Sequence, residues 1–198
     1  MAKRLSYLAF SVAAALFFCI CGSTLSAKAT ETAAAKNFTP PVNFHQVSKK
    51  IFRSGQPETG EFVSLHQTKG VRSVLNLRQY HSDRYKIYLA NRQTVNAIAL
   101  YEIPINTSRI SEKDICQILT VIRDAPKPLL IHCWHGSDRT GCAVAAYRIV
   151  FENWSVEAAI AELMKPEYGH HKLFYTNIPA LLRKANWKKI KAAILSSR

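Results

Sequence analysis

Hydrophobic and polar positions follow two different periods along residues 44–198, and the change between them predicts strands separated by helices. Short apolar runs rich in β-branched residues are typical of strands, and they occupy residues 51–53, 71–77, 99–105 and 129–131. Apolar residues at helical spacing predict helices over residues 58–69, 85–97, 111–123, 140–150 and 156–164. We expect Pro104 to break the strand in which it lies. The alternation predicts an α/β fold with a central, mainly parallel sheet flanked by helices.

The helix expected over residues 111–123 has the clearest pattern. Ser111 can cap it, and Asp114 follows three residues later. Its apolar face comprises Ile115, Ile118, Leu119 and Ile122.

Residues 178–196 predict one basic amphipathic helix at the end of the chain. We expect it to pack on the domain with its basic face in solvent. Attachment to a membrane surface is the alternative. The basic charge of this segment would suit nucleic acid, but the sequence contains no recognised nucleic-acid-binding module. We therefore expect no nucleic-acid partner.

The first 29 residues have the pattern of a signal peptide. Lys3 and Arg4 precede an apolar run over residues 5–21, and Ala27 and Ala29 provide the small residues of a cleavage site after Ala29. We therefore expect a periplasmic or secreted protein, with an uncleaved membrane anchor as the alternative. Residues 30–43 are interpreted as a linker and residues 44–198 as one domain.

Charge and cysteine content narrow the function. Residues 30–198 keep 24 of the 27 Lys and Arg residues against 13 Asp and Glu residues, which favours anionic partners. Three cysteines remain in this part of the chain: Cys116, Cys133 and Cys142. An odd number argues against a disulfide framework and leaves at least one free thiol available for chemistry.

Residues 129–141 contain the arrangement that carries the chemistry. A buried strand leads into Cys133, a short loop with Gly136 follows, and Arg139 opens the next helix. Such a turn directs successive N–H groups and the positive end of a helix toward an anion. Arg139 can hold two phosphate oxygens, and the same field makes a Cys133 thiolate available for attack on phosphorus. Thr140 has a hydroxyl placed to hydrogen-bond the sulfur.

Two other interpretations of these residues remain. Cys133 could be a core cysteine and Arg139 a surface residue of the helix. Alternatively, the loop could belong to a binding module that holds phosphate without cleaving it.

The segment His132-Cys-x-x-Gly-x-x-Arg-Thr-Gly141 resembles the signature loop of the protein tyrosine and dual-specificity phosphatases. Residues 52–57 and 147–150, with Trp154 just beyond, are similar to compact bacterial members of that family. The resemblance implies a dual-specificity-phosphatase-like fold, a cysteinyl-phosphate intermediate, and neither a metal nor an organic cofactor. It also implies a phosphorylated protein as substrate, with phosphotyrosine first and phosphoserine or phosphothreonine also possible. The expected phosphate-binding residues are Trp134, His135, Gly136, Ser137, Asp138 and Arg139.

The general acid departs from the family pattern. In the family an Asp supplies the proton from a mobile loop between a strand and the helix before the signature strand. Here that loop is residues 104–111, which contain no carboxylate, and Ser108 stands in its place. We expect Asp138 to protonate the leaving oxygen. The alternative is that Asp138 only pairs with a cation or caps the helix, and Asp83 is the reserve candidate.

The remaining candidates receive structural interpretations. His132 is expected to hold the loop, Cys142 to pack in the core, and His170 and His171 to be solvated rather than to bind a metal. A Cys133–Cys142 disulfide is an alternative. The loop lacks the Lys common in phosphoinositide-cleaving relatives, which favours a phosphoprotein over an inositol phosphate or phosphoinositide substrate.

Overall fold

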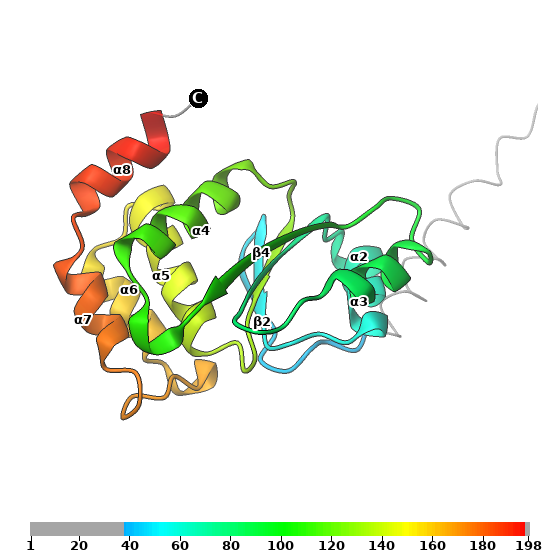
Figure 1. Ribbon diagram of the computed structural model, residues 1–198, viewed down its shortest axis with the longest axis horizontal. Helices are drawn as coiled ribbons and strands as arrows, with labels where there is room; N and C mark the ends of the chain where they lie inside the picture. Colours follow the sequence, from blue (N-terminus) through cyan, green and yellow to red (C-terminus); the bar gives the residue numbers. More distant parts are fainter. Residues whose placement is uncertain (1–37, 197–198) are drawn as a thin grey trace, which may run out of the picture.

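The computed structural model describes residues 38–196 (Figure 1), so the predicted signal peptide lies outside the described residues. The strands are β1 (His45–Ser48), β2 (Ile51–Ser54), β3 (Ser73–Arg78), β4 (Ala99–Ile105) and β5 (Leu129–His132). The α-helices are α2 (Thr59–Lys69), α3 (Arg84–Asn91), α4 (Glu112–Asp124), α5 (Asp138–Phe151), α6 (Val156–Leu163), α7 (Asn177–Lys184) and α8 (Trp187–Ser196). Two short 3₁₀ helices, η1 (Thr107–Arg109) and η2 (Pro166–Tyr168), complete the described elements.

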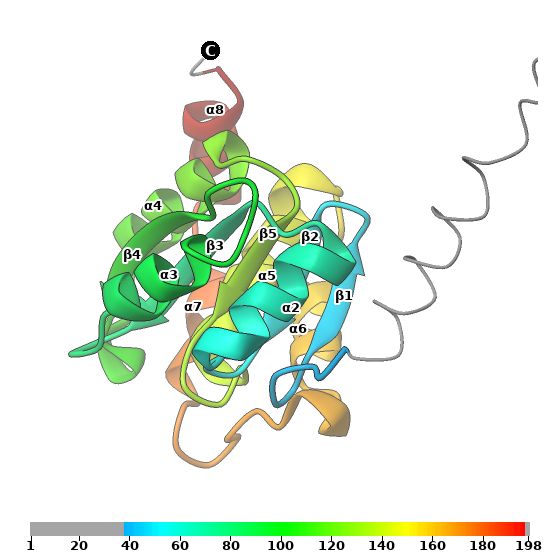
Figure 2. The ribbon, with the colours of Figure 1, turned by 90° about the vertical axis from the view of Figure 1, so that its right-hand side faces the viewer.

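The five strands form one sheet in the order β1-β2-β5-β3-β4. All neighbouring pairs are parallel except β1 and β2, so the predicted mainly parallel α/β sheet is confirmed. Helices α2 and α3 cover one face, and α4 to α7 lie on the other (Figures 1 and 2). Strand β1, which the sequence pattern did not predict, adds an antiparallel edge.

Both faces of the sheet are buried, which explains the continuous apolar runs in its central strands. In β5, Leu130 packs into the core beneath α2 and α3, whereas Leu129 and Ile131 pack into the larger core on the side of α4 and α5. All three side chains are fully buried. The strand that leads to Cys133 is therefore fixed from two sides.

The predicted start of α4 is confirmed. The Ser111 side chain accepts a hydrogen bond from the Asp114 N–H at 3.4 Å, and the Asp114 carboxylate accepts one from the Ser111 N–H at 2.8 Å. The four predicted apolar residues of this helix are all buried.

Two predicted elements differ in their limits. The helix expected over residues 85–97 ends at Asn91, because the Asn91 side chain accepts from the Ile98 N–H at 2.7 Å and donates to the Ile98 carbonyl at 3.2 Å. These two bonds turn the chain back toward β4. The expected break at Pro104 is absent, since β4 is an edge strand with a register shift opposite β3, where a proline is tolerated.

The C-terminal segment is two helices instead of one. Extended backbone at Ala185 separates α7 from α8, and the Trp187 indole N–H donates to the Leu182 carbonyl at 2.7 Å. The apolar residues Ile190 and Ile194 of α8 are buried against the domain. The predicted packing of the tail on the domain is confirmed. Because the apolar residues of α8 already pack on the domain, attachment to a membrane surface finds no support.

Within residues 38–196, no helix is both long and apolar enough to span a bilayer.

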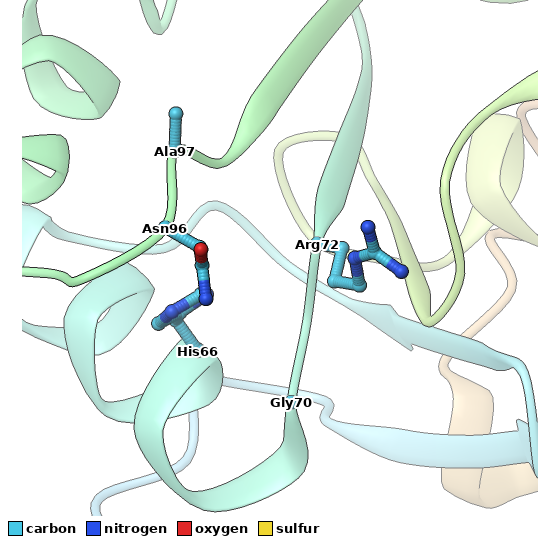
Figure 3. A pocket seen from close by; sticks show the side chains of 5 residues that line it. All are labelled: His66, Gly70, Arg72, Asn96 and Ala97. Atoms are coloured by element: carbon cyan, nitrogen blue, oxygen red, sulfur yellow. The ribbon is translucent and has the colours of Figure 1, made fainter.

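At the amino ends of β3 and β4 the surface has an open hollow of about 540 Å³ (Figure 3). Its lining residues are His66, Gly70, Arg72, Asn96 and Ala97. Because β3 and β5 run parallel, this hollow lies at the opposite end of the sheet from Cys133.

The cap of α4 gives a prediction about stability. We expect Ser111→Ala to lower the free energy of unfolding by about 1 kcal/mol, because the N–H of Asp114 loses its acceptor. Ser111→Thr keeps a hydroxyl and serves as the control. Urea unfolding of the three proteins measures the difference, and equal stability of the alanine variant and the wild type would contradict the role of the cap.

Candidate active site

The predicted site residues lie together on the loop from β5 to α5, at the carboxyl ends of the parallel strands. Strand β5 is flanked by β2 and β3, so this loop emerges from the centre of the sheet. Helix α5 begins at Asp138, one residue before Arg139. We call residues 133–139 the signature loop. Its position is the usual place for ligand binding in parallel α/β sheets.

The carbonyl groups of the signature loop are held from outside the loop. The Gln56 N–H donates to the Trp134 carbonyl at 2.9 Å, and the Asn43 side chain donates to the His135 carbonyl at 3.0 Å. Both donors come from segments that lead into or out of the first two strands. Asn43 belongs to the end of the predicted linker, so this part of it contacts the site directly.

Arg53 holds the next carbonyl. Its Nη2 atom donates to the Gly136 carbonyl at 2.7 Å, and its guanidinium lies 4.0 Å from the centre of the Tyr168 ring. Arg53 is only 1% exposed, and this burial lowers its pKa despite the aromatic and anionic neighbours. Gly136 has a φ of 74°, and a Cβ atom there would lie 2.5 Å from the carbonyl carbon of Ser54. Only glycine fits this position without displacing backbone.

The N–H groups of the loop have no such partners. Among the described residues, none of the backbone N–H groups of residues 134–140 has a hydrogen-bond acceptor. The Arg139 Nε and Thr140 Oγ1 atoms are also buried without a partner there. Because polar groups without a partner are costly, a set of unpartnered donors around one loop is the arrangement expected of an anion site.

Cys133 lies at the base of this loop and is 2% exposed. Its thiol is free, and so is that of Cys142, so no disulfide joins them in this structure. The prediction that Cys142 packs in the core is confirmed, and complete burial raises its pKa to about 12. Cys142 therefore stays protonated at neutral pH.

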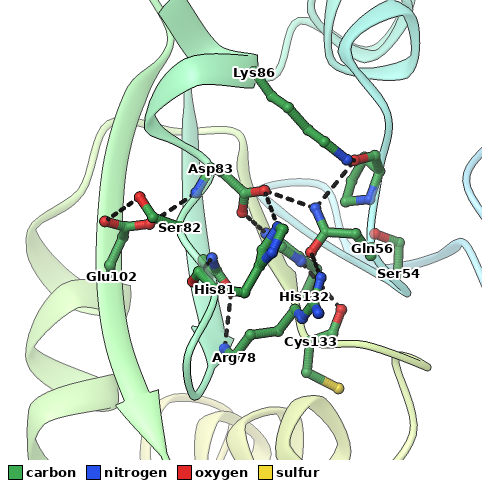
Figure 4. A network of polar contacts seen from close by, with 12 residues as sticks. Ser54, Gln56, Arg78, His81, Ser82, Asp83, Lys86, Glu102, His132 and Cys133 are labelled. Atoms are coloured by element: carbon green, nitrogen blue, oxygen red, sulfur yellow. Dashed lines mark hydrogen bonds and ion pairs between the residues drawn. The ribbon is translucent and has the colours of Figure 1, made fainter.

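A buried contact between His132 and Asp83 supports the loop from the sheet side (Figure 4). His132 Nε2 lies 2.9 Å from Asp83 Oδ2, and both side chains are fully buried. Gln56 also donates to Asp83 at 2.7 Å. Burial alone would raise the pKa of Asp83, but hydrogen bonds from His132 and Gln56 hold it below its ordinary value. Asp83 is thus fully buried, with its carboxylate in contact with Gln56 and His132.

Asp138 is held by two histidines. Its Oδ1 lies 2.7 Å from His170 Nδ1 and accepts from the His171 N–H at 3.0 Å, and its Oδ2 lies 2.7 Å from His171 Nδ1. The expectation of two solvated histidines is wrong, because the His170 side chain is 1% exposed and both rings contact the loop. Burial raises the pKa of Asp138, but these contacts outweigh it and lower the pKa overall.

The exposed rim of the site carries Trp134 and Arg78. Trp134 is 53% exposed, and the Arg78 guanidinium lies 4.1 Å from the centre of its ring. Arg78 also donates to the Gln56 side chain at 2.8 Å (Figure 4). Sequence reasoning missed Arg78, Arg53 and Asn43. Only Arg53 had a signal, since it lies inside the segment that resembles bacterial phosphatases.

A parallel sheet that delivers a cysteine into a loop of free N–H groups, closed by an arginine, defines the class of cysteine-dependent phosphatases. A model of the tyrosine phosphatase family matches residues 38–176. The chain belongs to this family and is a phosphoric monoester hydrolase.

Similar proteins fall into two groups. The dual specificity protein phosphatase TpbA of Pseudomonas aeruginosa (strain UCBPP-PA14) is 28% identical over 173 residues, which cover 83% of this chain and 75% of TpbA. The inositol diphosphatase DSP5 of Arabidopsis thaliana is 33% identical over 134 residues, or 64% of this chain and 62% of DSP5. The crystal structure of P. aeruginosa TpbA superposes with a TM-score of 0.67 at 25% identity, covering 78% of this chain and 91% of that one.

The Asp83–His132 pair gives a prediction that depends on pH. We expect Asp83→Ala to lower the free energy of unfolding by about 3 kcal/mol at neutral pH, because His132 loses its buried partner. The pKa of Asp83 is lower in the folded protein than in the unfolded chain. The ionised Asp83 therefore makes its full contribution to the free energy of unfolding at pH values above the ordinary pKa of an aspartate. It is lost as the pH falls through the lower folded value.

The loss caused by Asp83→Ala should therefore shrink below about pH 4. Urea unfolding of both proteins between pH 7 and pH 3 measures it. A loss that stays constant over this range would contradict an ionised Asp83 in the folded protein.

Proposed function

We propose that this chain hydrolyses phosphorylated proteins, phosphotyrosine first, with Cys133 as the nucleophile. The observation that carries the proposal is the turn that begins at Cys133, whose N–H groups have no acceptor among the described residues and whose Arg139 Nε and Thr140 Oγ1 atoms are buried without a partner. The relative TpbA is named a dual specificity protein phosphatase, and TpbA has been solved in complex with phosphotyrosine. Phosphoserine and phosphothreonine are further candidate substrates.

The first step of the proposed reaction transfers the phosphoryl group to sulfur. The loop N–H groups and Arg139 hold the phosphate oxygens, and the Cys133 thiolate attacks phosphorus as the bond to the leaving oxygen breaks. The leaving oxygen takes up a proton as this bond breaks. Asp138 is one of the residues that control the transfer of this proton. Water then attacks phosphorus, the sulfur–phosphorus bond breaks, and Thr140 stabilises the departing thiolate.

We also propose that the protein acts in the periplasm or outside the cell. The support is the pattern of residues 1–29, with cleavage after Ala29. The partner is then a phosphorylated protein of the same compartment.

A panel of substrates tests the proposed activity. We expect the wild type to release phosphate from phosphotyrosine peptides faster than from inositol phosphates. Cys133→Ser should lose at least ~10³-fold in kcat, the scale on which hydrolases lose turnover without their nucleophile. Arg139→Lys should lose about 10²-fold, because a lysine cannot hold two oxygens in one plane. Turnover that survives Cys133→Ser would refute the assignment of the nucleophile.

Inositol diphosphates are the second candidate substrates, and Arg78 is the observation that favours them. Several relatives, DSP5 among them, are named inositol diphosphatases. Arg78 interacts electrostatically with both Arg139 and Cys133, so it places a second cation beside the proposed phosphate site. A substrate with a second phosphate next to the reacting one would use this cation.

Arg78→Ala separates the two candidates. If diphosphates are the substrates, the variant should lose about tenfold or more in kcat/KM on an inositol diphosphate while its activity on phosphotyrosine peptides changes little. Arg72→Ala, at the opposite end of the sheet, is the control for loss of surface charge. Equal effects on both substrates would remove the argument for a second phosphate contact.

A further inference from the structure

The His170–His171 pair is placed against the signature loop although it is distant from it in the sequence. The segment that contains both histidines follows η2 and lies beside the β5–α5 loop (Figures 1 and 2). Gly169 brings it close, since a Cβ atom there would lie 3.3 Å from the Ser137 hydroxyl. The two rings contact one carboxylate, that of Asp138, from opposite oxygens.

The two histidines differ in their access to substrate. The His170 side chain is 1% exposed, whereas that of His171 is 38% exposed. His171 uses Nδ1 to contact Asp138, which leaves Nε2 for another partner. The centre of its ring lies 5.3 Å from that of His135, an exposed residue of the loop. His171 is therefore the member of the pair at the rim of the proposed phosphate site.

Asp138 is poorly suited to donate a proton itself. The contacts with His170 and His171 lower its pKa, so the carboxylate is ionised at neutral pH. An ionised carboxylate that accepts from an imidazole instead orients the ring and favours its protonated form. Imidazole is also the side chain that most readily exchanges a proton near neutral pH.

We propose that His171, oriented by Asp138, is the general acid that replaces the missing loop aspartate. The proposal rests on the proposed function, in which Cys133 is the nucleophile. As sulfur bonds to phosphorus and the bond to the leaving oxygen breaks, the proton of His171 Nε2 passes to that oxygen. Neutral His171 then takes a proton from the water that attacks phosphorus, and Cys133 leaves as a thiolate.

Titratable groups from two parts of the chain lie around His171. Asp138 of α5 and His135 of the signature loop contact it, and His170 and Tyr175 belong to its own segment. Of these, Asp138 is the group that holds the ring in place, through its Oδ2 atom at 2.7 Å from His171 Nδ1. Asp138 is thus a positioning residue in this scheme, and His171 is the catalytic one.

The dependence on the leaving group tests the proposal. Phenyl phosphate has a poor leaving group that needs a proton, whereas para-nitrophenyl phosphate has a good one that needs it little. We expect His171→Asn to lower kcat on phenyl phosphate by about 10²-fold and on para-nitrophenyl phosphate by less than about fivefold. Asparagine still places an N–H near Asp138.

Two matched variants complete the experiment. His170→Asn removes an equivalent contact to Asp138 from a buried ring, so it should affect both substrates by the same factor. His66→Asn, in the hollow at the opposite end of the sheet, controls for the substitution itself (Figure 3). Urea unfolding of each variant confirms that it is folded.

The possible failures are distinguishable. If His171→Asn lowers both activities equally, or leaves both unchanged, His171 is not the acid, and the role of Cys133 stands. If the loss of kcat depends on the leaving group in His170→Asn but not in His171→Asn, the proton donor is His170 and the proposal is wrong. If Cys133→Ser keeps the activity on para-nitrophenyl phosphate, the proposed function itself fails.

Discussion

The site depends on three consecutive carbonyl groups that are hydrogen-bonded away from its centre. Gln56, Asn43 and Arg53 hold the carbonyls of residues 134, 135 and 136, each from a different part of the first 56 residues. A peptide plane whose carbonyl is fixed outward must direct its N–H inward. The anion site is therefore a consequence of these bonds, and the loop keeps its unpaired N–H groups because the opposite side of each peptide is satisfied.

Burial on both faces of the sheet makes this arrangement rigid. Strand β5 is enclosed between two cores, and the polar groups nearest the loop, Arg53, Asp83 and His132, are buried with it. Buried ionic groups of this kind stabilise a fold only when they are paired in good geometry. Here their partners are the loop and one another, so the same contacts that satisfy buried charge also fix the position of Cys133.

The sequence predicted the parts of the site that are local. The apolar run before Cys133, the glycine at 136 and the Arg-Thr pair at 139–140 specify a strand, a turn and a helix within thirteen residues. The supporting contacts could not be predicted in this way, because Arg53 and Asn43 lie 83 and 92 residues from the carbonyls that they hold. His171 was misjudged for the same reason, since its partner Asp138 is 33 residues away and only the tertiary fold brings them together.

Trapping the covalent intermediate tests the central claim most directly. The wild-type protein would be mixed with an excess of para-nitrophenyl phosphate, quenched with acid within milliseconds, digested and analysed by mass spectrometry. A sulfur at the base of a loop of N–H groups should yield a phosphate adduct on the peptide that contains Cys133, and none in Cys133→Ser. A phosphate adduct on another residue, or turnover without dependence on Cys133, would contradict it.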